Sequence, residues 1–262
     1  MSKKICLALG SGGSKGLAHV GVIKALCENG FEISQIAGTS AGALVGGLFA
    51  ANPDYRALEE TAKTINYLEL VKIFVDWPVK NALVRGRKVE KYLDTMCQGK
   101  SIEKLPIKFK AVCSDLVEGK KFVFEKGKLS TAIRASCTIP AIFSPIRAEG
   151  KLLIDGGAVD PVPVSELSPE KGEKIVAVGL YSKIFPKSYR KLAKANITQI
   201  AYASMQVMVC QLSEKNVDLA DIKILPEVED INVLNFVKAK KYIDIGYEAT
   251  MKQMPEIEKL FR

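Results

Sequence analysis

The pentapeptide Gly38-Thr39-Ser40-Ala41-Gly42 has the G-x-S-x-G pattern of a nucleophile elbow. In such an elbow a serine lies on a tight turn between a strand and a helix, and the flanking glycines let the backbone bend. The serine Oγ then projects into a cleft. Ser40 is therefore the candidate nucleophile, with Gly38 and Gly42 as the elbow glycines.

A serine nucleophile usually relies on a histidine base, but His19 is the only histidine of this chain. In known catalytic triads the three residues follow one another along the chain in one of a few orders. The order Ser–Asp/Glu–His is excluded here because no histidine follows Ser40. The order His–Asp–Ser fails because no aspartate lies between His19 and Ser40, and Asp–His–Ser fails because no acid precedes His19. The base is therefore either a carboxylate or His19 used in an unfamiliar order.

The leading carboxylate is Asp155, which ends a short apolar run and is followed by Gly156 and Gly157. An aspartate at a strand end, freed by two glycines, can aim its carboxylate into the cleft at the carboxyl edge of an α/β sheet. A carboxylate is a weak base in water, so such a site needs partial desolvation to raise its pKa. The alternative is an ordinary turn, because Asp-Gly is a common turn dipeptide.

A glycine-rich loop, residues 10–16, follows the first apolar run of the chain. Its glycines allow several backbone N–H groups to point at one spot, and the next helix adds the positive end of its dipole. This arrangement suits a phosphate or an oxyanion. The nucleotide-binding patterns fail, because Lys15 is followed by Gly16 rather than Ser or Thr, and no register of G-x-G-x-x-G is complete. A purely structural tight turn stays an alternative.

The elements around these motifs alternate between strands and helices. Residues 5–9 and 33–37 are predicted strands, and residues 17–29 and 41–51 are predicted helices. This order opens a parallel α/β fold, and continuous apolar strands suit a sheet covered on both faces. Further strands are predicted at 107–113, 121–124, 152–154, 174–181 and 223–225, and further helices at 54–75, 88–98 and 129–136. We therefore predict an α/β fold with a mostly parallel central sheet sandwiched by helices.

Length and composition indicate an ordinary globular domain. The chain has 262 residues, of which 48% are hydrophobic and 26% charged, and it shows no internal repeat and no clear linker. We predict one domain over residues 1–262, with 52–105 as a candidate helical cap and 182–262 as a mostly helical C-terminal part. The N-terminal apolar run is too short for a signal peptide, and six scattered cysteines fit free thiols in a reducing cytosol. These features predict a cytoplasmic protein and give a metal site no support.

The net charge of +9 is mostly diffuse lysine, but one segment stands out. Residues 183–194 carry five cations and no acid, with apolar residues between them. Such a stretch is a candidate for peripheral contact with an anionic membrane surface, at the inner face of the membrane for a cytoplasmic protein. A solvated loop that enters a helix is the simpler alternative. No nucleic-acid-binding motif accompanies the charge. The five cations are Lys183, Lys187, Arg190, Lys191 and Lys194.

Taken in order, the three motifs resemble the patatin-like phospholipase family. Its bacterial members have a glycine-rich oxyanion loop, then Gly-Leu-Ala-His, then G-x-S-x-G, and later Asp-Gly-Gly or Asp-Gly-Ala. This chain has Ser-Gly-Gly-Ser-Lys-Gly-Leu-Ala-His at 11–19, and the matches at 113–116, 132–137 and 160–164 extend the resemblance over residues 4–180. Ser11 departs from the pattern, since many members have glycine there. The loop contributes backbone N–H groups, so a serine at this position need not disable it.

The resemblance implies a three-layer α/β/α fold and a lipid acyl hydrolase with a Ser–Asp dyad. By motif match Ser40 is the nucleophile, Asp155 is the base, and Gly12 and Gly13 line the oxyanion hole. The substrates would be phospholipids, lysophospholipids or related acyl esters, with no metal or organic cofactor. His19 would have a packing role. An acyltransferase on the same scaffold and a non-catalytic anion-binding or nucleotide-binding regulator remain the alternatives.

Overall fold

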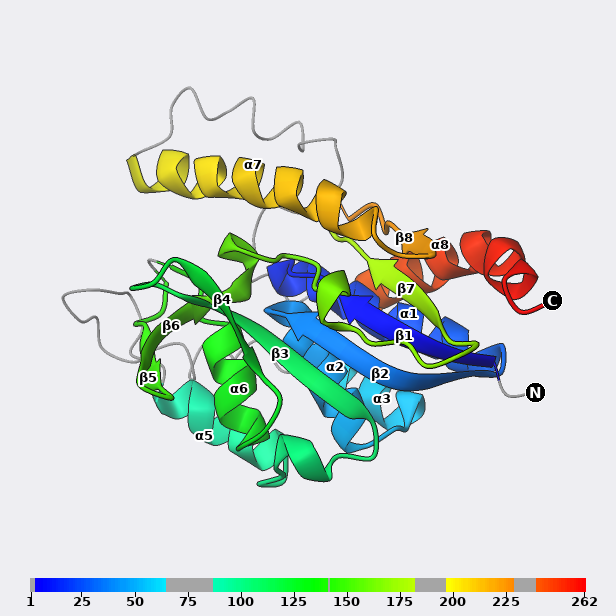
Figure 1. Ribbon diagram of the computed structural model, residues 1–262, viewed down its shortest axis with the longest axis horizontal. Helices are drawn as coiled ribbons and strands as arrows, with labels where there is room; N and C mark the ends of the chain where they lie inside the picture. The colour runs from blue at the N-terminus through cyan, green and yellow to red at the C-terminus, as the bar shows by residue number, and fades with distance from the viewer. Residues whose placement is uncertain (1–2, 65–86, 141, 182–196, 229–238) are drawn as a thin grey trace.

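The computed structural model describes residues 3–64, 87–140, 142–181, 197–228 and 239–262. The strands of this part form one eight-stranded sheet in the order β5-β6-β3-β2-β1-β7-β8, with β4 paired to β3 (Figure 1). The α/β fold class is confirmed. The strands are β1 (Lys3–Leu9), β2 (Phe31–Thr39), β3 (Lys108–Asp115), β4 (Lys120–Phe124), β5 (Ile146–Ala148), β6 (Lys151–Asp155), β7 (Lys174–Val178) and β8 (Ile222–Ile224).

The sheet is parallel on one side and antiparallel on the other. The pairs β1–β2, β1–β7, β2–β3 and β7–β8 are parallel. The pairs β3–β4, β3–β6 and β5–β6 are antiparallel. The central sheet is therefore mixed, with its parallel pairs on one side and its antiparallel pairs on the other. Short turns join β3 to β4 and β5 to β6, and a short turn can only connect antiparallel neighbours.

Alternate residues of β1 face opposite sides of the sheet, as the pleat requires. Ile5, Leu7 and Leu9 belong to the larger hydrophobic core, which they share with the helices on one face. Cys6 and Ala8 point to the other face, where residues 162–167 and the end of α7 cover them. The helices are α1 (Ala18–Glu28), α2 (Ala41–Ala51), α3 (Tyr55–Thr64), α5 (Arg87–Met96), α6 (Leu129–Ser136), α7 (Ile197–Val217) and α8 (Ala239–Lys259).

The candidate cap and the C-terminal part fall only partly on described residues. In the described portion, α3 packs against α1, and α5 packs against α6. Residues 65–86 of the predicted cap and the basic segment 183–194 lie outside the described residues. None of the described helices is long and apolar enough to cross a lipid bilayer.

Candidate active site

The two proposed reactive residues, Ser40 and Asp155, lie at the carboxyl ends of β2 and β6, which meet beside β3. β2 runs along one edge of β3 and ends with Thr39 opposite Val112. β4 pairs along the opposite edge of β3. β6 therefore pairs with β3 on the same edge as β2, beyond the residue where β2 ends. β6 runs in the opposite direction and ends with Asp155 opposite Cys113, the next residue along β3. The carboxyl ends of β2 and β6 therefore meet, which brings Ser40 and Asp155 together from distant parts of the sequence.

Ser40 adopts the strained backbone expected of a nucleophile elbow. Its φ is 55° and its ψ is −119°, a conformation that a non-glycine residue rarely adopts. The Ser40 N–H donates to Ser136 Oγ at 2.8 Å, and Ser136 Oγ–H donates in turn to the Val112 carbonyl at 2.6 Å. The Cys137 thiol donates to the Ser40 carbonyl at 3.1 Å. These contacts from the end of α6 hold the turn in place.

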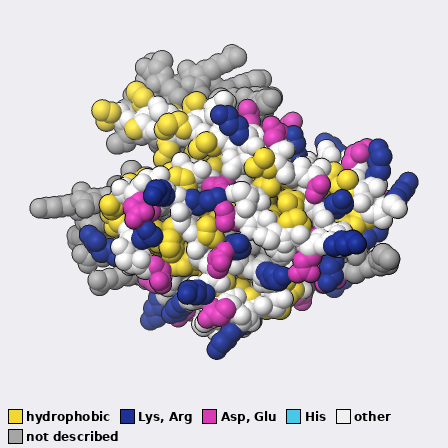
Figure 2. Space-filling model, viewed as in Figure 1, with side chains coloured by type: hydrophobic (Ala, Val, Ile, Leu, Met, Phe, Trp, Pro, Cys, Tyr) yellow, Lys and Arg dark blue, Asp and Glu magenta, His cyan; other side chains and the backbone are white. Residues whose placement is uncertain are grey.

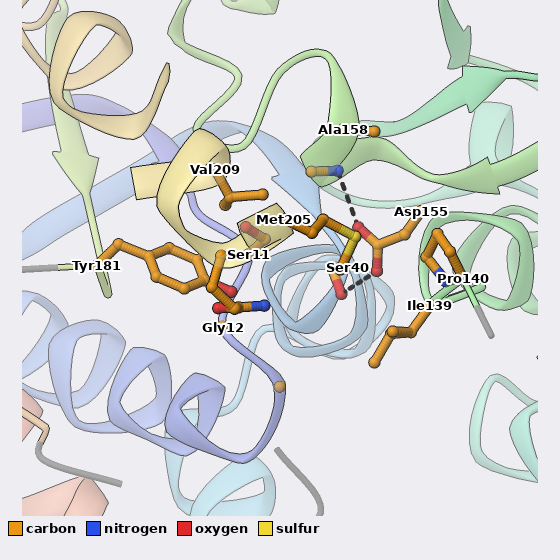
Figure 3. Close-up of a pocket in the computed structure, with 13 residues that line it drawn as sticks. Ser11, Gly12, Ser40, Ile139, Pro140, Asp155, Ala158, Tyr181, Met205 and Val209 are labelled. Carbon is orange, nitrogen blue, oxygen red and sulfur yellow. Dashed lines mark hydrogen bonds between the residues drawn. The ribbon is translucent and has the colours of Figure 1, made fainter. Parts of the chain in front are cut away.

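The Ser40 hydroxyl donates a hydrogen bond to Asp155 Oδ2 at 2.6 Å (Figure 3). The second carboxylate oxygen, Oδ1, accepts the Gly157 N–H at 2.8 Å. Both residues are buried, with 4% of Ser40 and 7% of Asp155 exposed. Burial raises the pKa of Asp155 to about 6, although the hydrogen bonds from Ser40 and Gly157 oppose the shift. The carboxylate is therefore a stronger base than an exposed aspartate.

The glycines of the motifs are needed because backbones approach closely here. A Cβ on Gly42 would lie 2.0 Å from the Leu9 carbonyl oxygen, and one on Gly38 would lie 2.5 Å from the Gly42 carbonyl oxygen. A Cβ on Gly156 would lie 2.3 Å from the Val112 carbonyl oxygen. These opposing atoms belong to the backbone and cannot rotate away. Small residues thus allow α2 to pack on β2 and allow β6 to end beside it.

The glycine-rich loop lies across the pocket from this dyad of Ser40 and Asp155. Gly12 and Gly13 line the same pocket as Ser40 and Asp155. Gly13 has a φ of 57°, which glycine adopts without strain. The Ser11 N–H donates to the Pro161 carbonyl at 2.8 Å, and the Lys15 N–H donates to the Gly12 carbonyl at 3.2 Å. The loop is thereby fixed at both ends, with the amides of Gly12 and Gly13 between.

His19 is fully buried on α1 and lies away from the pocket lining. Its Nε2 is 2.7 Å from the carbonyl oxygen of Gly10, so the ring N–H donates to the start of the glycine-rich loop. Burial lowers the pKa of His19 to about 4, so the ring is neutral at physiological pH. His19 anchors the loop, and no described contact links it to Ser40.

Residues 160 and 161 connect the elbow to the loop, a link that the sequence did not predict. The Thr39 hydroxyl donates to the Asp160 carbonyl at 2.8 Å, and the adjacent Pro161 carbonyl accepts the Ser11 N–H. The Asp160 carboxylate is buried and accepts from Lys121 Nζ at 2.9 Å. The resemblance covers this segment as a match at 160–164 but implies no role for it.

A small pocket that is partly open to solvent contains Ser40 and Asp155. Figure 3 shows Ser11 and Gly12 on one side of the dyad and Ile139 and Pro140 on the other. The rest of the lining includes apolar side chains, of which Met205 and Val209 come from α7. An apolar pocket with a few convergent polar groups is typical of a site for a largely apolar ligand.

Comparison with known families agrees with this arrangement. A family model described as patatin-like phospholipase matches residues 7–168, which contain all three motifs. The chain belongs to the patatin-like phospholipase family. An uncharacterized NTE family protein of Mycobacterium tuberculosis is 38% identical over 182 residues, which are 68% of this chain and 49% of that protein.

Two further proteins are similar over nearly the whole chain. Lysophospholipase NTE1 of Kluyveromyces lactis is 29% identical over 267 residues, which are 92% of this chain and 18% of that protein. The chain thus spans half or less of the length of these curated relatives. The crystal structure of VipD from Legionella pneumophila superposes with a TM-score of 0.62 at 16% identity, over 97% of this chain and 67% of VipD. At that identity the likeness concerns the fold alone.

Proposed function

We propose that this protein is a serine acyl hydrolase that cleaves carboxylic esters of phospholipids, lysophospholipids or related acyl lipids. The observation that carries the proposal is the hydrogen bond from Ser40 Oγ to Asp155 Oδ2, 2.6 Å long and buried in the pocket. A hydroxyl that already donates to a base is prepared to lose its proton as it attacks. The family match and the relative named as a lysophospholipase support the acyl-lipid class.

In the proposed mechanism Ser40 Oγ attacks the ester carbonyl carbon while its proton passes to Asp155 Oδ2. The carbonyl oxygen becomes the oxyanion of a tetrahedral intermediate, and the N–H groups of Gly12 and Gly13 stabilise it. Collapse of this intermediate expels the alcohol, which takes the proton from Asp155 and leaves an acyl-enzyme on Ser40. Water, deprotonated by Asp155, then attacks the acyl-enzyme; the bond from the acyl carbon to Ser40 Oγ breaks, Asp155 returns the proton to Ser40 Oγ, and the fatty acid is released.

The environment of Asp155 suits both proton transfers. With a pKa of about 6 the carboxylate is ionised at neutral pH and is a stronger base than an aspartate with the ordinary pKa of 3.8. The Gly157 N–H bonded to Oδ1 keeps the carboxylate oriented, so that Oδ2 faces the hydroxyl. The dyad therefore does without the histidine that other serine hydrolases use.

Two variants test the proposal on a panel of short-chain esters, lysophospholipids and diacyl phospholipids. Ser40→Ala removes the nucleophile and should abolish turnover of every substrate that the wild type cleaves. Asp155→Asn keeps the shape but removes the base, so we expect a loss of about 100-fold to 10,000-fold in kcat. Undiminished turnover by Ser40→Ala would refute the proposal, and retained activity of Asp155→Asn would show that the base is another group.

A further inference from the structure

The helix α7 has an unusual composition for a helix at the surface of a protein. Its first sixteen residues, 197–212, contain no charged side chain. A helix that is apolar all round is normally buried in a core or in a membrane. Among the side chains of α7 that the structure describes, those on one side are buried and those on the other are exposed, and the exposed side requires an explanation.

The two sides of α7 are separated by the helical repeat. Ala203, Gln206, Val209 and Cys210 are buried toward the rest of the protein. The opposite side is exposed, with 82% of Ile197, 50% of Ile200, 45% of Val207 and 59% of Met208 accessible to solvent. Ala201 and Ser204 lie between them and are also exposed. We call these six residues the outer face of α7, and Figure 2 shows hydrophobic side chains gathered where this helix lies.

The inner side of the same helix covers the candidate active site. Met205, Gln206 and Val209 line the pocket that contains Ser40 and Asp155. In Figure 3, Met205 and Val209 come from α7 and lie over the pocket. A single helix therefore separates the reactive serine from the exposed apolar outer face.

The size of the outer face favours a lipid surface over a protein partner. A standard protein–protein interface buries about 800 Å² on each partner and involves about 20–30 residues a side. Within the described residues, the outer face of α7 provides six residues on one helix, and none of the six is charged. A lipid surface needs no shape complementarity, and it accepts apolar side chains from a helix that lies in its plane. Exposed apolar patches of this kind mark interaction sites.

We propose that the outer face of α7 docks onto a lipid surface, so that only this helix separates the pocket from the acyl lipids that it receives. The choice of lipid as the occupant rests on the proposed acyl-hydrolase function. The apolar side chains provide the binding, so it does not depend on the net positive charge of the chain.

Binding to phosphatidylcholine vesicles tests the docking separately from catalysis. The protein carries Ser40→Ala, so that the vesicles stay intact, and binding is measured by flotation in about 0.5 M salt, where charge attraction is largely screened. We expect Val207→Gln with Met208→Gln to lower the partition coefficient about tenfold, the effect of losing about 1.4 kcal/mol of apolar contact. The matched control is Met251→Gln, at a methionine of α8 that is 37% exposed, and it should bind as the parent does.

A second readout uses the otherwise wild-type enzyme. The double variant at Val207 and Met208 should hydrolyse a soluble short-chain ester at the wild-type rate and vesicle phospholipid about tenfold more slowly. Unchanged vesicle binding by the double variant would overturn the proposal, as would binding that high salt abolishes. A concentration-dependent dimer that the double variant loses would overturn it in favour of a second copy. If no ester is hydrolysed while docking through α7 persists, the proposed function fails and the docking surface stands.

Discussion

The buried carboxylate of Asp155 should make the rate of catalysis depend on pH between about pH 5 and pH 7, where an ordinary aspartate stays ionised. Burial raises its pKa from 3.8 to about 6, a shift that corresponds to about 3 kcal/mol. Only the ionised carboxylate can accept the Ser40 proton. The active fraction therefore falls about tenfold between pH 7 and pH 5, whereas an aspartate with a pKa of 3.8 would lose only about 6% of it.

The assay is the initial rate of hydrolysis of a soluble, uncharged short-chain ester between about pH 4.5 and pH 8. The expected plot of log kcat/KM against pH rises with unit slope below about pH 6 and is level above about pH 7. Circular dichroism at each pH separates loss of the active form from loss of the fold. A rate that stays the same from pH 7 to pH 5 in folded protein would refute the argument that burial tunes this base.

Three further predictions follow from the geometry. Because burial raises the pKa of Asp155 in the folded state, the ionised carboxylate lowers the free energy of unfolding; this cost is absent below about pH 3.8 and complete above about pH 6. The Tm of Asp155→Asn relative to wild type should therefore rise by on the order of 5 °C between pH 4 and pH 7. A difference in Tm that stays constant over this range would contradict the prediction. Ser136→Ala removes the acceptor of the Ser40 N–H, so it should lower kcat about tenfold and leave KM nearly unchanged. It should also lower the free energy of unfolding by about 1–3 kcal/mol. A variant with the kcat of the wild type would show that the elbow does not need this hydrogen bond. Gly42→Ala places a Cβ 2.0 Å from the Leu9 carbonyl and should cost about 3 kcal/mol or more, measured from the urea midpoint; a wild-type midpoint would contradict the close packing of α2.

Local pattern predicted most elements of this fold, because their signals lie within single segments. The helices at 41–51 and 129–136 have the predicted bounds, and the strands of the parallel half differ by only a few residues. The short strand β5 was missed, since its three residues carry too little periodicity. The short turn at Glu118-Gly119 indicated the antiparallel neighbours β3 and β4. The pairing of β6 with β3 was not predicted, because it joins strands far apart in the sequence and depends on tertiary contacts rather than on composition. The division into one domain with a helical cap stays a prediction.

The candidate site was only partly predictable, for a similar reason. Ser40 and Asp155 emerged because their motifs are local and because the single histidine removed the usual base. The contact between them depends on two strands that end against each other beside β3, which no segment encodes alone. The supporting contacts of Ser136, His19 and Asp160 were missed, since single polar residues give no spacing signal. The catalytic roles of Ser40 and Asp155 stay predictions.

The most direct test of the account is covalent labelling by a fluorophosphonate, followed by mass spectrometry of the peptides. The Ser40–Asp155 dyad predicts one labelled site, on Ser40, in the wild type and no labelling of Ser40→Ala. Asp155→Asn should label far more slowly, because its serine has lost the base. Equal labelling of wild type and Ser40→Ala, or a label on another serine, would contradict the claim that Ser40 is the nucleophile.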